Sequence, residues 1–187
     1  MEERERGYYK ALYNVAKAVS SSLDLRQVLD SIAISAAWAV NAKACLVRLL
    51  DSDRDELLAT ASYGLSQEYL GKGGVALSEN PTDREVLQGK VVQIHDVTAD
   101  ERFKYQEEAK REGLVSLLIL PLLVEGKGIG VMRFYTRYAR EFSQDEVDFL
   151  GAVADLSALA IENARVHQSL RVDYEALTSW FTMQGAT

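Results

Sequence analysis

The sequence predicts an α/β protein of the α+β type, with a central sheet that is covered on both faces. Two apolar runs, 115–124 and 129–136, are separated by the turn sequence EGKG at 125–128. Runs this short and this rich in Val, Ile and Leu are typical of strands buried on both sides. We therefore expect a hairpin at the centre of the sheet. Because Pro121 lacks a backbone N–H, a bulge or pairing gap is expected there.

Helical periodicity marks both ends of the chain. Apolar residues recur at spacings of three and four from Tyr9 to Val19 and again from Leu25 to Val40. Asp24 stands where an N-cap would begin the second of these helices. Ser143 and Glu146 have the spacing of a capping box, which opens a helix expected to run past residue 170.

The middle of the chain predicts strands that alternate with short helices. The expected elements are strands 44–50 and 57–63, a glycine-rich segment 65–80 of little periodicity, a short helix from Asn80-Pro81 to Gly89, a strand 91–94, and a helix that Thr98 caps and Gly113 ends.

The long C-terminal helix carries a heptad seam, which predicts contact with a second chain. Seam residues alternate spacings of four and three; they are Phe149, Val153, Leu156, Ala160, Asn163, His167, Leu170, Tyr174, Leu177 and Phe181. Since the seam outruns a domain of this size, we expect a homodimer formed through residues 8–22 and 143–175. A free helix end, or one that folds back on its own domain, is the alternative.

Composition excludes several function classes. The net charge of −7, from 28 acidic and 21 basic residues, argues against nucleic acid and anionic membrane surfaces as partners. No apolar run is long enough to span a membrane, and the charged N-terminus shows no secretory signal. Cys45 is the single cysteine and cannot form an internal disulfide, so the cytoplasm is the expected compartment.

Four segments occur in an order that carries a family resemblance. They are Val91–Val97 with Asp100–Phe103, Gly113–Leu122, Gly128–Met132, and a closing helix that includes Phe142–Glu146 and Ala160–Ala164. Together they resemble the GAF domain, a small-ligand sensing module related to PAS domains. The resemblance covers about residues 8–168. It leaves residues 1–7 as a charged tail and residues 169–187 as a C-terminal helical extension or signalling linker.

The resemblance implies a GAF-like fold and a regulatory role. The terminal helices would cover one face of an antiparallel sheet, and short helices and loops would enclose a pocket on the other. The expected function is small-molecule sensing in signal transduction, with occupancy passed through a dimeric helical bundle to a downstream kinase or regulator. The alternative is a ligand-free structural module that only dimerises a larger signalling protein.

Two arginines are the sharpest candidates for ligand binding. Arg48 and Arg133 each stand in an otherwise apolar strand, and the resemblance makes these strands neighbours. A guanidinium in such a strand is costly unless it meets an anion or reaches solvent. The first reading is a pair of donors for an anionic ligand. The second is that each arginine pairs with an internal carboxylate or extends to the surface.

Other polar and aromatic residues border the pocket that the resemblance implies. Tyr63 begins the segment expected to line it, and His95 and Asp96 end a strand near its mouth. His95 has no second ligand at motif spacing, so neither metal nor haem is expected and the cofactor is left unknown. Asp96 alternatively caps the following loop, and His95 alternatively bonds to backbone.

Phe103 and Tyr105 lie on the helix expected to roof the pocket, where either could stack on a planar ligand. A place in the core or on the surface is their alternative. Ser116 is the polar residue of an apolar strand, and it would bond either a ligand or a backbone group.

No catalytic constellation is visible, so we expect that the chain is not an enzyme. Relatives that reduce free methionine sulfoxide depend on several cysteines, whereas this chain has only Cys45. Cys45 also lies in the wrong strand to attach a bilin. The pattern of cyclic-nucleotide-binding relatives is incomplete, because only two residues separate Phe142 from Asp145.

Overall fold

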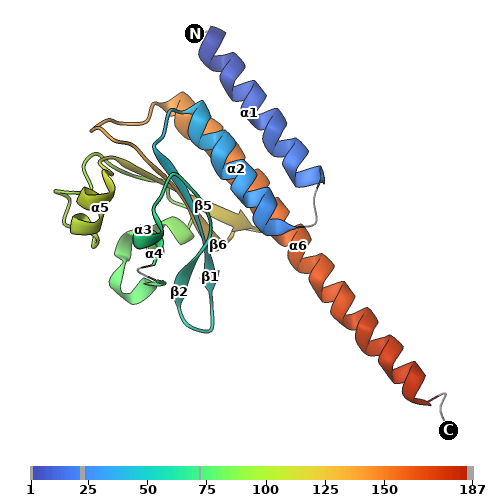
Figure 1. Ribbon diagram of the computed structural model, residues 1–187. Coiled ribbons are helices and arrows are strands. Elements are labelled where there is room, and N and C mark those ends of the chain that lie inside the picture. Colours follow the sequence, from blue (N-terminus) through green and yellow to red (C-terminus); the bar gives the residue numbers. More distant parts are fainter. Residues whose placement is uncertain (1, 22–23, 72, 185–187) are drawn as a thin grey trace.

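The computed structural model describes residues 2–21, 24–71 and 73–184 (Figure 1). The description leaves out residues 1, 22–23, 72 and 185–187. Three predicted segments therefore lie partly outside the described residues: the charged tail 1–7, the dimer segment 8–22 and the C-terminal extension 169–187. The elements, in chain order, are α1 (Glu2–Ser21), α2 (Leu25–Ala39), β1 (Ala44–Asp51), β2 (Glu56–Tyr63), α3 (Gln67–Leu70), β3 (Val75–Ala76), η1 (Leu77–Glu79), α4 (Pro81–Leu87), β4 (Val92–Ile94), α5 (Gln106–Glu112), β5 (Leu117–Val124), β6 (Lys127–Tyr135) and α6 (Gln144–Gln184).

The strands form one antiparallel sheet in the order β3-β2-β1-β6-β5-β4. The expected α+β class is therefore confirmed, and β5 and β6 form the hairpin that the two apolar runs predicted. The expected irregularity occurs in β5, but the shift falls between Leu122 and Leu123. Pro121 itself stays opposite Val131. The register change is thus displaced slightly towards the turn.

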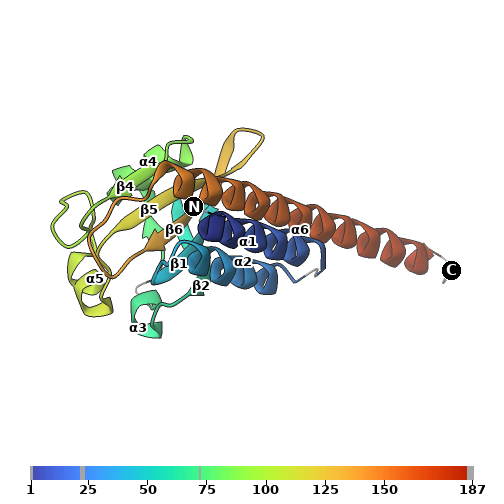
Figure 2. The ribbon, with the colours of Figure 1, turned by 90° about the horizontal axis from the view of Figure 1, so that it is seen from above.

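Helices α2 and α6 pack on one face of the sheet, and α1 packs on these two helices on their side away from the sheet (Figure 1 and Figure 2). Alternate strand residues such as Cys45, Val47 and Phe134 supply the sheet's half of this core. Tyr8 of α1 stacks on Phe149 of α6 with ring centroids 4.4 Å apart. The first helix and the closing helix therefore pack together within a single chain, and the homodimer expected through the same helices stays a prediction.

Short elements cover the other face of the sheet, where α3, α4 and α5 pack with their connecting loops (Figure 1). A second apolar core forms on this side from the intervening strand residues, including Leu46, Leu117 and Val131. Complete burial of each such side chain stabilises the fold by about 1.5–3 kcal/mol. The sheet is thus buried on both faces, which explains its near-continuous apolar strands.

Two predicted helix starts are confirmed by their hydrogen bonds. The Asp24 carboxylate accepts from the backbone N–H groups of Arg26 and Gln27, at 3.0 and 3.2 Å. At α6, the Ser143 backbone N–H donates to Glu146 at 2.8 Å, and the Glu146 N–H donates to the Ser143 hydroxyl at 3.4 Å. This reciprocal pair is the capping box read from the sequence.

One predicted helix start is confirmed without its side-chain bond, and another is wrong. Helix α4 begins at Pro81 with Asn80 in the N-cap position, as predicted, but the Asn80 amide donates to the carbonyl of Ala76 and makes no capping bond. No helix begins at Thr98: its hydroxyl and backbone N–H both donate to Asp96 in a local turn, and α5 starts only at Gln106. Gly113 does end α5, in the left-handed conformation at φ 69°.

Helix α6 extends far beyond the rest of the domain (Figure 1). Its early seam residues, from Phe149 to Ala160, pack mostly inside the chain's own helical layer. From residue 165 to 172 every side chain is exposed. At the other end, α1 already begins at Glu2, so the charged run that reads as a tail is part of the helix.

Candidate functional site

The two predicted arginines lie together on the face of the sheet opposite α1, α2 and α6. In the β1–β6 pairing, Leu46 stands opposite Arg133 and Arg48 stands opposite Val131. Arg48 and Arg133 are therefore diagonal neighbours on one face, with Cβ atoms about 7 Å apart. Both residues are buried, at 0% and 4% exposure. The strand register thus creates a buried pair of positive charges.

Arg133 is neutralised from within the protein. One of its terminal nitrogens, Nη2, lies 2.5 Å from both carboxylate oxygens of Asp83, and both side chains are buried. Asp83 reaches it from α4, where it shares a face with the buried Val86 three residues later. Burial opposes the charge of Arg133, but Asp83 and Tyr135 together outweigh this and raise the pKa of the guanidinium. Of the two alternatives for Arg133, the structure therefore shows the second, in which the arginine pairs with a carboxylate of the protein itself.

Arg48 has no carboxylate partner in the described part of the chain. Its Nη1 donates to the backbone carbonyls of Leu57 and Gly73, at 2.8 and 3.2 Å. Its Nε and Nη2 are buried and have no hydrogen-bond partner among the described residues. Burial lowers the pKa of this guanidinium and the nearby charge of Arg133 lowers it further, whereas Tyr135, Tyr69 and Asp83 oppose this lowering. With Arg48, Arg133 and Asp83 ionised, the group keeps one uncompensated positive charge.

Two tyrosines complete this group. Tyr135 of β6 lies beside Arg133, and Tyr69 of α3 packs edge-on against the Tyr135 ring at 6.3 Å. Burial raises the pKa of the Tyr69 phenol far above its usual range, and the hydrogen bond with Tyr135 adds to this. Both effects favour the neutral phenol, so Tyr69 brings polarity but no negative charge. We refer to Arg48, Arg133, Asp83, Tyr69 and Tyr135 as the arginine group.

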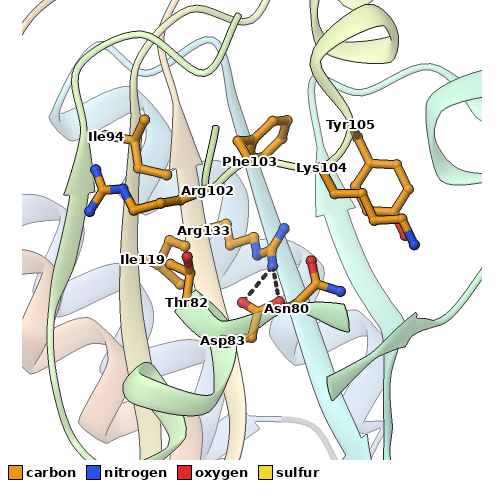
Figure 3. A pocket seen from close by; sticks show the side chains of 10 residues that line it. All are labelled: Asn80, Thr82, Asp83, Ile94, Arg102, Phe103, Lys104, Tyr105, Ile119 and Arg133. Carbon is orange, nitrogen blue, oxygen red and sulfur yellow. Dashed lines mark hydrogen bonds and ion pairs between the residues drawn. The ribbon is translucent and has the colours of Figure 1, made fainter. Parts of the chain in front are cut away.

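A small cavity lies beside Arg133, between α4 and the loop that leads into α5 (Figure 3). Its volume is about 10 Å³, which is room for about one water molecule. Its lining residues come from α4 and its flanks, from β4 to β6 and from the loop; they are Asn80, Thr82, Asp83, Ile94, Arg102, Phe103, Lys104, Tyr105, Ile119 and Arg133. An organic ligand therefore needs this region to open.

Phe103 and Tyr105 border this cavity from a loop rather than from the predicted helix (Figure 3), and their stacking on a ligand stays a prediction. The misplaced helix start at Thr98 is the reason for the difference. Their rings meet edge-on at 6.5 Å. Between them, Lys104 forms an ion pair with Glu79 of η1, which ties the loop to the segment before α4. The cavity is therefore roofed by a loop that the ion pair ties to η1 and that the buried Phe103 anchors in the second core.

A larger hollow of about 300 Å³ opens to solvent between α3 and α5. Its walls carry both signs of charge, from Glu68, Glu108, Arg111 and Glu112. The buried Tyr69 also lines it. Because Tyr69 contacts Tyr135 on its other side, it stands between this outer hollow and the arginine group.

The structure does not bring Tyr63, His95 or Asp96 into the arginine group. Tyr63 packs against the helical layer on the opposite face, where its hydroxyl accepts from Trp38 Nε1 at 2.8 Å. His95 is exposed. Asp96 accepts two hydrogen bonds from Thr98, of which the one from the hydroxyl contributes most to lowering the pKa of the Asp96 carboxyl. This is the capping arrangement named as its alternative.

Ser116 forms hydrogen bonds with backbone groups, which is the alternative to binding a ligand. Its buried hydroxyl lies 2.6 Å from the His95 carbonyl and 3.1 Å from the Tyr138 carbonyl, and it accepts from the Arg140 N–H at 2.7 Å. These contacts join the loop after β4 to the segment that leads into α6. Ser116 is therefore part of the frame around the arginine group.

Sequence reasoning missed Asp83, Tyr69 and Tyr135. A signal for Asp83 was available, because its spacing of three from Val86 places it on the apolar face of a short helix. Two arginines in half-buried strands also call for a carboxylate nearby. Tyr69 lies in a segment without periodicity, and nothing in its local sequence points to the sheet.

The family of the chain follows from a match to a family model. The model described as GAF domain matches residues 22–162, which is most of the sequence. The chain belongs to the GAF domain family. The motif-based resemblance is thereby confirmed. No curated protein sequence shows significant similarity to the chain.

Solved structures with the same fold include GAF domains of different proteins. The GAF domain of a phosphoenolpyruvate-protein phosphotransferase from Coxiella burnetii is 21% identical, with a TM-score of 0.78 over 88% of this chain and 98% of that one. A domain of a putative two-component sensor histidine kinase from Sinorhizobium meliloti 1021 is 21% identical, with a TM-score of 0.61 over 74% and 90%. These likenesses show the GAF fold.

An enzyme also shares this fold. Free methionine-R-sulfoxide reductase from Neisseria meningitidis, solved in complex with its substrate, is 20% identical. Its TM-score is 0.71 over 86% of this chain and 91% of that one. The fold therefore occurs in signalling proteins and in an enzyme, and the expectation that this chain is not an enzyme stays a prediction. Among the described residues, no helix is both long enough and apolar enough to cross a lipid bilayer.

Proposed function

We propose that this GAF domain is a cytoplasmic sensory module that binds a small anion at the arginine group. The observation that carries the proposal is Arg48, which is fully buried, has no carboxylate partner in the described chain and leaves two guanidinium nitrogens without hydrogen bonds. An unpaired buried donor costs about 1–3 kcal/mol, and more when it is charged. A bound anion would supply the missing charge and acceptors.

Binding would require the site to open, and this requirement gives the ligand control over conformation. The cavity beside Arg133 holds about 10 Å³, so the closed form excludes an organic ligand. The loop with Phe103 and Tyr105, which roofs this cavity, is the part that would move. A ligand that binds only the open form shifts the population towards it.

The signal would leave through the helical bundle. Residues 165–172 of α6 are exposed on all sides, and Leu170 and Tyr174 of the heptad seam are 61% and 67% exposed. An isolated helix of this kind is marginal in water, whereas two such helices would bury their seams on each other. We infer a homodimer through α1 and α6, with a kinase or another regulator downstream.

The test of the proposal begins with a native mass spectrum of the protein as purified, which reports subunit number and any retained ligand. An NMR titration with acetate at constant ionic strength then measures anion binding directly. We expect Arg48→Met to weaken acetate binding tenfold or more, which corresponds to about 1.4 kcal/mol or more. The matched control is Arg54→Met, which removes the same charge from the exposed β1–β2 turn. Equal acetate binding by Arg48→Met and wild type would reject the proposal.

One observation favours a second function, a ligand-free module that dimerises a larger signalling protein. The small cavity is almost filled by its own side chains. In that case the protein would form a dimer, retain no small molecule and show no acetate-dependent shifts. An enzymatic function of the methionine sulfoxide reductase kind is not proposed, because Cys45 is a single buried thiol.

A further inference from the structure

The positive side chains around the arginine group differ in one respect, which is whether a carboxylate faces them. Arg102 pairs with Asp100, with Nη2 and Oδ2 2.6 Å apart, and Lys104 pairs with Glu79. Arg133 pairs with Asp83 in the buried interior. Among the described residues that border the cavity or the arginine group, these pairs neutralise each cation but one. Arg48 is the exception, since backbone carbonyls are its only hydrogen-bond acceptors there.

The buried charge therefore amounts to a single positive unit. Arg48 and Arg133 contribute two positive charges, and Asp83 contributes one negative charge. Tyr69 and Tyr135 contribute none as neutral phenols. Because the site is shielded from water, its charge balance weighs more heavily than the same balance would at the surface.

From this balance we infer that the site selects ligands with one negative charge, such as a monocarboxylate, and that Asp83 is the residue that sets this selectivity. The inference rests on the proposed function and deepens it. A monoanion on Arg48 would bring the buried charge to zero. A dianion would leave an excess negative charge next to the buried Asp83 carboxylate, where like charges repel strongly.

The position of Asp83 fits a selectivity role. Its carboxylate pairs with Arg133, which is the diagonal neighbour of Arg48, and it also lines the small cavity between α4 and the loop (Figure 3). Asp83 acts electrostatically on Arg48 as well, so a ligand bound by Arg48 would lie within the field of this carboxylate. It is 1% exposed, so water does not screen it. Asp83 would thus act by exclusion, while Arg48 provides the attraction.

The experiment compares two ligands that differ by one carboxylate, acetate and malonate, at a pH where malonate is fully ionised. Wild-type protein is expected to bind acetate at least tenfold more tightly than malonate. In Asp83→Asn the buried charge rises to two positive units, and malonate affinity is expected to increase tenfold or more. The matched control is Glu85→Gln, which removes the same charge from the exposed side of α4, where Glu85 pairs with Lys90. Its ligand preference should equal that of wild type.

The outcomes separate this inference from the proposed function. If wild type binds acetate but Asp83→Asn gains no affinity for malonate, or if Glu85→Gln produces the same gain, the selectivity role is overturned and the anion site stands. If wild type binds neither ligand, both are overturned. Should Asp83→Asn fail to fold, the wild-type comparison alone decides, because malonate binding equal to or tighter than acetate binding contradicts the single-charge balance.

Discussion

The change in the free energy of unfolding on replacing Arg48 by methionine distinguishes two roles of this residue, a ligand-binding group and a structural contact. Methionine keeps most of the volume of the arginine stem but carries no charge. The change removes two hydrogen bonds from a charged donor, to the carbonyls of Leu57 and Gly73, each worth about 1.5–3 kcal/mol. It also removes two buried nitrogens that have no partner among the described residues, each costing about 1–3 kcal/mol, together with the repulsion from Arg133 and the weaker attraction to Asp83.

These opposing contributions nearly cancel, and the repulsion tips the balance. We expect the free energy of unfolding of Arg48→Met, without ligand, to be unchanged or raised by up to about 2 kcal/mol. If Arg48 were a structural brace, its removal would instead cost about 3 kcal/mol or more, as breaking a well-made buried contact does.

Urea unfolding at pH 7, followed by tryptophan fluorescence, measures the difference. The exposed Arg54→Met variant should stay within about 0.5 kcal/mol of wild type and serves as the control. A loss of more than about 2 kcal/mol in Arg48→Met would refute the reasoning. It would show that the carbonyl contacts outweigh the unpaired charge and would leave no energetic argument for an anion at this position.

Three further predictions concern the dimer interface, the start of α6 and the buried cysteine. Leu170→Asp places a charge on the heptad seam and should raise the dimer dissociation constant, measured by sedimentation, at least about tenfold. Gln168→Asp, which lies off the seam, should leave it unchanged. Equal dissociation constants for Leu170→Asp and wild type would place the interface elsewhere. Glu146→Ala should lower the free energy of unfolding by about 2–4 kcal/mol in urea, because it leaves the half-buried Arg140 without its carboxylate; a loss under 1 kcal/mol would contradict this. Burial raises the pKa of the Cys45 thiol, so iodoacetamide should modify it at least about a hundredfold faster in urea than in native protein, and equal rates would tell against its burial.

Local sequence patterns were sufficient for the elements that bury a regular face. The hairpin of β5 and β6, the Asp24 cap and the Ser143–Glu146 capping box all follow from short-range spacing, and the structure contains them. The cap at Thr98 fails for an equally local reason. Asp96, two residues earlier, competes for the Thr98 hydroxyl and backbone N–H and closes a turn in place of a helix.

The site was predictable only in part, because its partners come from distant parts of the chain. Each arginine stood out as a charge in an apolar strand, and the β1–β6 register brings the two together. The ion pair of Arg133 joins residues 50 positions apart, and no local pattern encodes it. Tyr63 shows the opposite case: it stands next to the predicted pocket segment, but the alternation of β2 places it with the helical layer.

Helix α6 has the proportions of a lever. Its base is fixed at Glu146, which pairs with Arg140, and Arg140 also donates to the Val40 carbonyl at the end of α2. Beyond the last buried residue, Ile161, the helix continues for about 35 Å. A tilt of about 5° at Ile161, where the helix leaves the domain, would therefore move the far end by about 3 Å, given the 1.5 Å rise per residue. A displacement too small to disturb the packed sheet thus becomes a shift of more than half a helical turn at the point where another subunit would feel it.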